Sequence, residues 1–329
     1  MTRSTASRRL PELLLPAGSF ESGIAAIEGG ADALYLGFSS FSARKQARNL
    51  DPLEYRRLSG FARARGVRLY VAINPVILER ELAAVSELLA FLSRFRPDSI
   101  IVQDWGLARL IRQRHPGLTL HASTQTAVQG AEGARIAREL GVTRIVLPRE
   151  TPVAELARLR AEVPDLEYEV FVHGALCYSY SGLCLASGLL LGRSGNRGEC
   201  AQICRSYYSG EGPIGRKGYW FSCRDLRLLE RLESLAAAGA ASLKVEGRMK
   251  APEYCHAVAR LYRGALDRLG GASLSDTELE ERAEAARLAF ARSPTEAWLE
   301  ERGGSCLIDS EYPGHRGVPV GVVVASTKG

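Results

Sequence analysis

The sequence has no long hydrophobic run. Although 46% of its 329 residues are hydrophobic, no apolar stretch approaches the roughly 18 residues that a membrane-spanning helix needs. The first ten residues, MTRSTASRRL, are basic and polar and have no apolar segment behind them, which argues against a secretory signal. We therefore expect a disordered lead-in over residues 1–10, a cytoplasmic location and no membrane partner.

Two familiar signatures are also missing. No G-x-G-x-x-G follows the first apolar run, which weakens the case for a dinucleotide-binding open sheet. None of the cysteines form the paired C-x2-C knuckles that zinc ribbons favour.

Neither sign of charge dominates, because the net charge is only +6. That balance permits a nucleic-acid or phosphate partner without requiring one.

What the sequence does contain is a regular alternation of short apolar runs and amphipathic helical stretches. This pattern is typical of βαβ units and a parallel sheet. We expect strands at residues 12–16, 32–38, 68–74, 99–104, 118–123, 143–148, 166–174 and 242–248. Eight such repeats predict an α/β fold, a (β/α)8 TIM-like barrel, with a doubly wound open sheet as the alternative.

The barrel is expected to occupy residues 11–270. A breaker cluster, GGASLSD, follows it, and residues 271–329 are expected to form a C-terminal helix capped by Ser275 or Asp276 and then the beginning of a truncated β-rich domain. A helix is also expected over residues 225–239, before the eighth strand.

Polar and charged residues follow most of the predicted strands. In a barrel, residues at the carboxyl ends of the strands face one shared cavity. The residues concerned are Asn74, Gln103, Asp104, His121, Ser123, Gln125, Arg149, Glu150, His173, Lys244, Glu246 and Arg248. Any one of them could be an ordinary helix cap or loop residue, but their repetition at the same end of the barrel favours a functional site.

Four of the seven cysteines lie in one loop-rich window, expected at 174–220, after the seventh strand. They are Cys177, Cys184, Cys200 and Cys204, spaced C-x6-C-x15-C-x3-C. A reducing compartment disfavours disulfides, so the group indicates metal or redox chemistry. The irregular spacing suits a [4Fe–4S] cluster better than zinc, while unliganded cysteines are the third interpretation. Cys223 is a reserve ligand.

A cysteine peptidase is a competing hypothesis, because His173 precedes Cys177 by four residues and a thiolate nucleophile needs a nearby base. The sequence shows no clear third group to orient the histidine, and one nucleophile does not require four clustered cysteines.

Several long motifs resemble one known family. The segment EVFVHGALCYSYSGLCLASGLLLGRSGNRGECAQICR is similar to the signature of peptidase family U32, as are ELLLPAGSFESGIAAIEGGADALYLG and SLKVEGRMKAPEYCHAVARLYRGALD. The resemblance covers roughly residues 12–270. VQDWGL, LHASTQ and GRSGNRGECAQICR look most like the large members, which include the type that makes 5-hydroxycytidine in 23S ribosomal RNA.

The resemblance implies oxygen-independent hydroxylation of a pyrimidine base in RNA, either an rRNA cytidine or a tRNA uridine, despite the family's name. It implies a [4Fe–4S] cluster on Cys177, Cys184, Cys200 and Cys204, and prephenate as the oxygen-donor co-substrate. A hydroxylase or accessory protein for a small quinone precursor is one alternative, and a U32-type peptidase is another.

RNA and prephenate are both anionic, which suggests roles for the charged residues. Guanidinium and ammonium groups bind phosphates and carboxylates, and Tyr178 and Tyr180 could stack on a base or simply pack the loop. His173 and Glu246 are candidates for proton transfer. The expected substrate-binding residues are Asn74, His121, Gln125, Arg149, Arg193, Arg197, Lys244 and Arg248.

Overall fold

The computed structural model describes residues 10–210, 217–299, 305–317, 321–322 and 325. Nearly all of the expected disordered lead-in, and most of the expected start of a β-rich domain, lie outside the described residues. Within the described part of the chain, no helix is both long enough and apolar enough to cross a membrane.

Eight parallel strands close into a barrel. Each strand pairs with the next, and the last strand pairs both with β7 and with β1, where Ser242 lies opposite Glu12. The strands are β1 (Glu12–Ala17), β2 (Ala33–Leu36), β3 (Arg68–Ile73), β4 (Ser99–Val102), β5 (Leu120–Ala122), β6 (Val142–Val146), β7 (Glu167–Ala175) and β11 (Ser242–Val245). The predicted barrel is confirmed, and the closing pairs exclude an open sheet.

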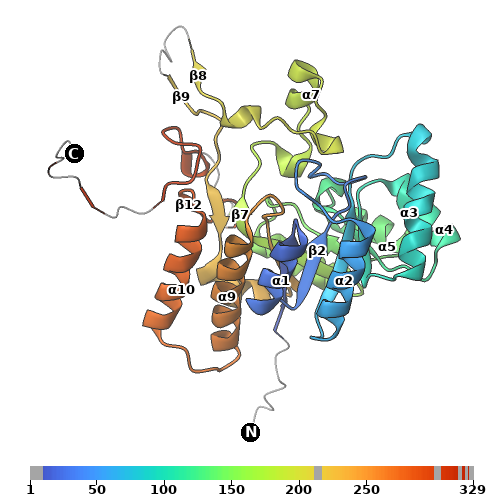
Figure 1. Ribbon diagram of the computed structural model, residues 1–329, viewed down its shortest axis with the longest axis horizontal. Coiled ribbons are helices and arrows are strands. Elements are labelled where there is room, and N and C mark those ends of the chain that lie inside the picture. The colour runs from blue at the N-terminus through green and yellow to red at the C-terminus, as the bar shows by residue number, and fades with distance from the viewer. Residues whose placement is uncertain (1–9, 211–216, 300–304, 318–320, 323–324, 326–329) are drawn as a thin grey trace.

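Helices follow the strands and cover the outside of the barrel (Figure 1). Local capping sets where several of them begin: the Asp51 side chain accepts from the Glu54 backbone N–H at 2.8 Å, and Pro52 occupies the first turn. The barrel helices are α1 (Phe20–Glu28), α2 (Pro52–Arg63), α3 (Leu82–Arg94), α4 (Trp105–Arg114), α5 (Ala131–Glu139), α6 (Val153–Glu162), α8 (Leu232–Ala237) and α9 (Pro252–Leu269).

The prediction of one helix over residues 225–239 was wrong at its start. Asp225–Arg227 form a strand, β10, which pairs antiparallel with the end of β7 from His173 to Ala175. The last residues of β7 extend past the barrel, so their backbone groups form a free sheet edge. The backbone N–H and C=O groups of β10 are hydrogen-bonded to this edge, and they do not form a helical turn.

The remaining elements lie beyond the barrel, and two of them bring the C-terminal segment back to it. The expected Ser275 cap is confirmed, because its side chain accepts from the Glu278 backbone N–H at 3.2 Å. These elements are α7 (Ala186–Leu191) and the pair β8 (Tyr208–Ser209) and β9 (Lys217–Gly218) in the cysteine loop, then α10 (Asp276–Ala289) and β12 (Pro294–Thr295). β12 pairs with β10, so the chain after α10 joins the same sheet.

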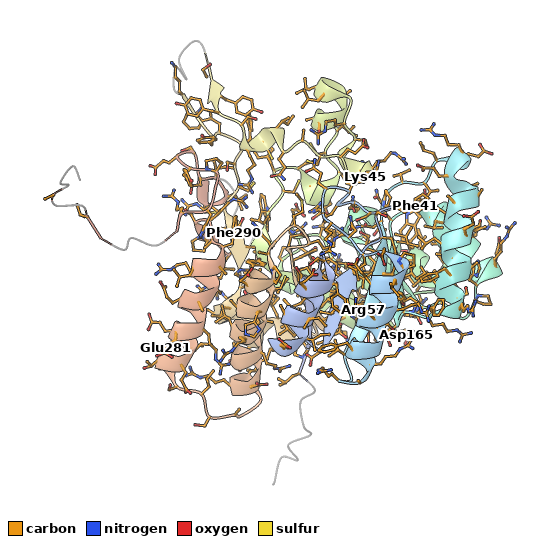
Figure 2. The ribbon with its side chains drawn as sticks, in the orientation of Figure 1. Phe41, Lys45, Arg57, Asp165, Glu281 and Phe290 are labelled. Atoms are coloured by element: carbon orange, nitrogen blue, oxygen red, sulfur yellow. The ribbon has the colours of Figure 1, made fainter. Side chains whose placement is uncertain are left out.

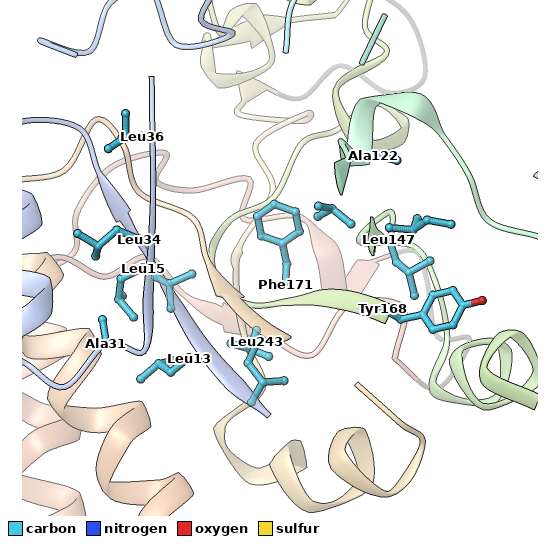
Figure 3. Packing of buried hydrophobic residues seen from close by; sticks show 14 of the residues in the cluster. Leu13, Leu15, Ala31, Leu34, Leu36, Ala122, Leu147, Tyr168, Phe171 and Leu243 are labelled. Atoms are coloured by element: carbon cyan, nitrogen blue, oxygen red, sulfur yellow. The ribbon is translucent and has the colours of Figure 1, made fainter. Parts of the chain in front are cut away.

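The core fills two layers. Alternate residues of the first strands, such as Leu13 and Leu15, point outward and pack under the helices together with Leu34 and Leu36 (Figure 3). Their neighbours Leu14, Ala33, Tyr35, Tyr70, Ala72 and Ile101 form a separate cluster. Burying each large side chain stabilises the fold by about 1.5–3 kcal/mol.

A chain of buried charges also runs through the barrel. Arg144 lies 2.7 Å from Glu12 and 3.2 Å from Glu169, and Glu169 accepts from Lys244 at 2.8 Å. Each of these side chains is at most 5% exposed. Since buried charges are costly unless they are paired, the four side chains depend on one another.

We expect Arg144→Met to lower the free energy of unfolding by about 3–5 kcal/mol, because it leaves Glu12 and Glu169 without their shared partner. Arg135→Met is the matched control: Arg135 pairs with Glu132 and Glu162 on the surface, and its loss should cost less than about 1 kcal/mol. Urea unfolding of both variants checks this, and equal losses would contradict the account.

Candidate functional site

A cavity of about 350 Å³ lies at the carboxyl ends of the barrel strands, under the cysteine loop. This volume falls within the range of about 300–1,000 Å³ that is usual for small-molecule sites. The expected site residues that line it are Asn74, Gln125, Arg149, Cys177, Cys184, Cys200, Cys204, Lys244, Glu246 and Arg248. Residues more than 150 positions apart in the chain therefore share one space.

The four cysteines of the loop line this cavity together. Each is free and partly buried. Gly195 lies between two of them: a Cβ there would be at ordinary contact distance, 3.5 Å from the Cys184 carbonyl oxygen and 3.7 Å from the Cys200 Cβ. Gly198 has a φ of +83° and packs so closely on the Ser42 backbone that a side chain there would collide with it.

The four thiols are close enough to influence one another. Burial raises the pKa of the Cys204 thiol, Arg205 lowers it, and the charges of Cys177, Cys200 and Cys184 raise it further. In the part of the chain that the structure describes, however, no three His, Cys, Asp or Glu side chains are grouped so as to hold a metal ion. The four cysteines line one cavity without forming such a group, so their arrangement gives no support to a mononuclear zinc site.

Glu246 is an anion of the cavity wall. Its carboxylate lies 3.2 Å from Arg44 and 3.1 Å from Arg149. Burial disfavours its charge, but Arg44, Arg149, Arg248 and Lys244 together lower the pKa of Glu246 to about 2. A carboxylate with so low a pKa is a weak base near neutral pH, so its surroundings suit it better to anchoring the two guanidinium groups than to proton transfer.

Arg248 is buried beside this pair. It donates to the Ser42 hydroxyl at 3.0 Å, and its Nε has no hydrogen-bond partner. A buried guanidinium with an unused donor is unusual, because buried polar groups are nearly always paired. Arg248 therefore has the capacity to bind an anion that enters the cavity.

Four of the expected site residues do not line the cavity: His173, His121, Arg197 and Arg193. The His173 ring lies edge-to-face with that of Tyr262, whose hydroxyl is 3.3 Å from its Nδ1, and burial lowers the pKa of His173 to about 4. His121 lies with Ser99, at 3.0 Å, and burial with Arg144 lowers its pKa to about 3. Arg197 pairs with Glu81.

The other strand-end and loop residues have local tasks. Arg193 is exposed and outside the cavity. Asp104 caps α4 by accepting from the Leu107 backbone N–H at 2.9 Å. Tyr180 donates to Gln129, and Tyr178 is exposed with its ring against Phe221. These contacts agree with the interpretation of polar residues after strands as ordinary helix caps and loop residues.

Sequence reasoning did not assign three further cations to the cavity wall: Arg44, Lys250 and Arg292. Lys250 ends the motif KVEGRMK, so its position after the last barrel strand was an available signal. Arg292 had none, since it follows α10 and reaches the cavity only because the Asp225 backbone N–H donates to the Ser293 carbonyl at 3.0 Å. Part of the predicted C-terminal unit therefore completes the cavity.

With this geometry in place, comparison with known proteins is informative. The family model described as peptidase family U32 matches residues 18–308. The chain is 34% identical to the 23S rRNA 5-hydroxycytidine C2501 synthase of Escherichia coli, over 99% of this chain and 50% of the synthase. It is 31% identical to tRNA hydroxylation protein P of Haemophilus influenzae, over 78% of this chain and 67% of that protein.

Other relatives have different names. The chain is 32% identical to the collagenase of Porphyromonas gingivalis, over 78% of this chain and 65% of that protein. The solved structure of the U32 peptidase Mk0906 aligns with a TM-score of 0.51 at 15% identity, over 75% of this chain and 96% of that one, which shows a common fold. This chain spans about half the length of the rRNA synthase and about two thirds of the others.

The buried His121 should make the fold sensitive to acid. Its pKa is about 3 in the fold and about 6.5 when unfolded, so its contribution is complete above about pH 6.5 and is lost as the pH falls towards 3. His121→Asn should therefore reduce the drop in unfolding free energy between about pH 7 and pH 5 by up to about 2 kcal/mol. Urea titrations measure this, and an identical pH slope in both proteins would contradict it.

Proposed function

The chain belongs to peptidase family U32, and from that premise we propose that it is an enzyme that hydroxylates a pyrimidine base in RNA without molecular oxygen. The base would be an rRNA cytidine or a tRNA uridine; the names of its relatives mention 5-hydroxycytidine in 23S rRNA and hydroxylation of tRNA. The observation that carries the proposal is that four cysteines and a cationic wall line one cavity at the barrel mouth.

We assign a [4Fe–4S] cluster to Cys177, Cys184, Cys200 and Cys204. Such clusters are held by four cysteine thiolates, and these four thiols are free, partly buried and exposed to the same cavity. Arg205 favours the charged form of Cys204. When bound, the cluster would supply one-electron redox chemistry beside the substrate.

The protein's own residues would position the anionic reactants. Glu246 forms ion pairs with Arg44 at 3.2 Å and with Arg149 at 3.1 Å. These ion pairs fix the positions of the two guanidinium groups in the cavity wall. Arg248 keeps its unpaired Nε for a ligand. Guanidinium groups of this kind bind carboxylates and phosphates through paired hydrogen bonds, which suits prephenate as co-substrate.

Two amide side chains would face the base. Asn74 donates to the Gln125 Oε1 at 3.1 Å and accepts from the Ala43 backbone N–H at the same distance. Among the described residues the Gln125 Nε2 has no partner, so it remains a donor for a base edge. Hydrogen bonds to such edges are how proteins read an unstacked base.

Peptidase activity is the second candidate, because one relative is named a collagenase. A cysteine nucleophile needs a histidine base within hydrogen-bond reach. Within the described residues no cysteine is hydrogen-bonded to a histidine, and His173 does not line the cavity. The geometry therefore gives no support to a cysteine peptidase.

Protein purified without air should be brown and contain about four iron and four sulfide ions per chain. Cys204→Ala should lose most of the iron because one ligand is gone, whereas Cys255→Ala, buried in α9 and remote from the cavity, should retain it. Iron analysis of both variants and of Cys223→Ala makes the test. Iron lost from Cys223→Ala but kept in Cys204→Ala would move the fourth ligand to Cys223, and iron-free wild-type protein would overturn the cluster.

Deleting the whole gene should remove one hydroxylated pyrimidine from rRNA or tRNA. Mass spectrometry of nucleosides from the deletion strain checks this. Complementation with Arg149→Met should restore less than about a tenth of it, because a buried anion-binding group is lost, while the control Arg193→Met should restore it fully. If all hydroxylated pyrimidines persist and a quinone precursor accumulates instead, the small-molecule alternative replaces the RNA proposal.

A further inference from the structure

A second group of cations lines the cavity away from Glu246. It consists of Arg205 in the cysteine loop, Lys250 after β11 and Arg292 after α10. Three segments that are distant in sequence therefore each contribute one cation to the same wall, and the nearest carboxylate partner among them is Asp225, 2.9 Å from Arg292.

Lys250 is the least satisfied member of this group. Its ammonium lies 2.7 Å from the centre of the Phe290 ring and 5.9 Å from that of Tyr254. In the described part of the chain its Nζ has neither a carboxylate nor a hydrogen-bond acceptor. Phe290, labelled in Figure 2, directly follows α10, so the ring holds the ammonium at the boundary between barrel and C-terminal segment.

Arg292 approaches the same ring. Its guanidinium carbon is 5.1 Å from the centre of Phe290, while it donates to Asp225 at 2.9 Å and to the Pro313 carbonyl at 2.7 Å. Its side chain is only 13% exposed. Two cations thus share one aromatic ring, and only Arg292 has a carboxylate partner, in a place with little water to screen their repulsion.

Arg205 adds a third cation, and among the described residues no carboxylate forms an ion pair with it. It donates to the Ser222 hydroxyl at 2.8 Å and to the Cys223 and Leu176 carbonyls, all of which are neutral oxygens. The repulsion is visible at Lys250: burial and Arg292, with a smaller contribution from Arg205, lower its pKa to about 8, although Asp225 and Glu246 oppose this. An entering anion would relieve the imbalance.

The same imbalance exists at Arg248, which has no carboxylate within ion-pair distance among the described residues and an unpaired Nε. Its neighbours, Ser42 and Tyr35, differ from those of Lys250. One cavity of about 350 Å³ therefore contains two separate sets of cations that outnumber their carboxylate partners, and this matches a small ligand with two anionic groups more closely than a strand of nucleic acid.

We propose that Lys250, Arg292 and Arg205 form an anion subsite that binds one carboxylate of a small dianion, whose second anionic group binds at Arg248. The inference deepens the proposed function, on which it rests, by assigning the residues that hold the anionic co-substrate. It can be tested by binding alone, without RNA and without catalysis.

The test is calorimetric titration of the whole protein with prephenate, with inorganic phosphate and with a short single-stranded RNA. We expect Lys250→Met to weaken prephenate binding by about tenfold or more, the loss of one charged contact. Its melting temperature should stay the same or rise, because a like-charge repulsion is removed. Lys250→Arg should restore binding, and Lys217→Met, an exposed lysine of β9, should bind as wild type does.

The pH dependence separates this role from a general packing effect. Raising the pH from about 7 to about 9 should weaken prephenate binding to wild type, because Lys250 loses its proton, whereas Lys250→Arg should show little change. Unchanged prephenate affinity in Lys250→Met, or no binding to wild type, would overturn the subsite. A loss confined to RNA would overturn its assignment to a small dianion. Neither result bears on whether RNA is hydroxylated.

Discussion

The pairing of β11 with both β7 and β1 is the interaction on which the rest of the structure depends. It closes the barrel and sets the motif that ends in Lys250 beside the cysteine loop. The approach is so close that glycine is needed at both neighbouring strand ends: a Cβ at Gly18 would collide with the Arg248 carbonyl, and one at Gly174 would lie 2.6 Å from that of Glu246. Without these contacts, cysteines and cations would not face the same space.

Charge compensation is the second theme of the molecule. Inside the barrel every cation has a carboxylate, as the chain from Glu12 through Arg144 and Glu169 to Lys244 shows. At the barrel mouth Glu246 is shared by Arg44 and Arg149, and the remaining cations of the wall outnumber their partners. The charges inside the barrel are therefore paired, while positive charge is in excess at its mouth. This is the pattern expected of a site for anionic reactants.

Much of this could be predicted from the sequence, because strand and helix periodicity is local. The eight strands, the Ser275 cap and the gathering of the cysteines in one loop all follow from short patterns. The direction of a side chain at a strand end is harder to predict. The register of β11 against β7 shifts between Lys244 and Val245, and His173 next to this shift turns towards Tyr262 and away from the cavity.

Long-range packing outside the barrel could not be predicted. The sequence pattern of Asp225–Arg227 predicts a helix, and the strand that forms there depends on pairing with the edge of β7. Arg292 enters the cavity because β12 pairs with β10.

The central claim is that the four cysteines surround one inorganic cofactor at the barrel mouth. Anomalous X-ray scattering from crystals of anaerobically prepared protein, measured at the iron edge, tests it most directly. The account predicts one compact iron peak bounded by the sulfur atoms of Cys177, Cys184, Cys200 and Cys204; an iron peak elsewhere in the molecule, or none, would contradict it.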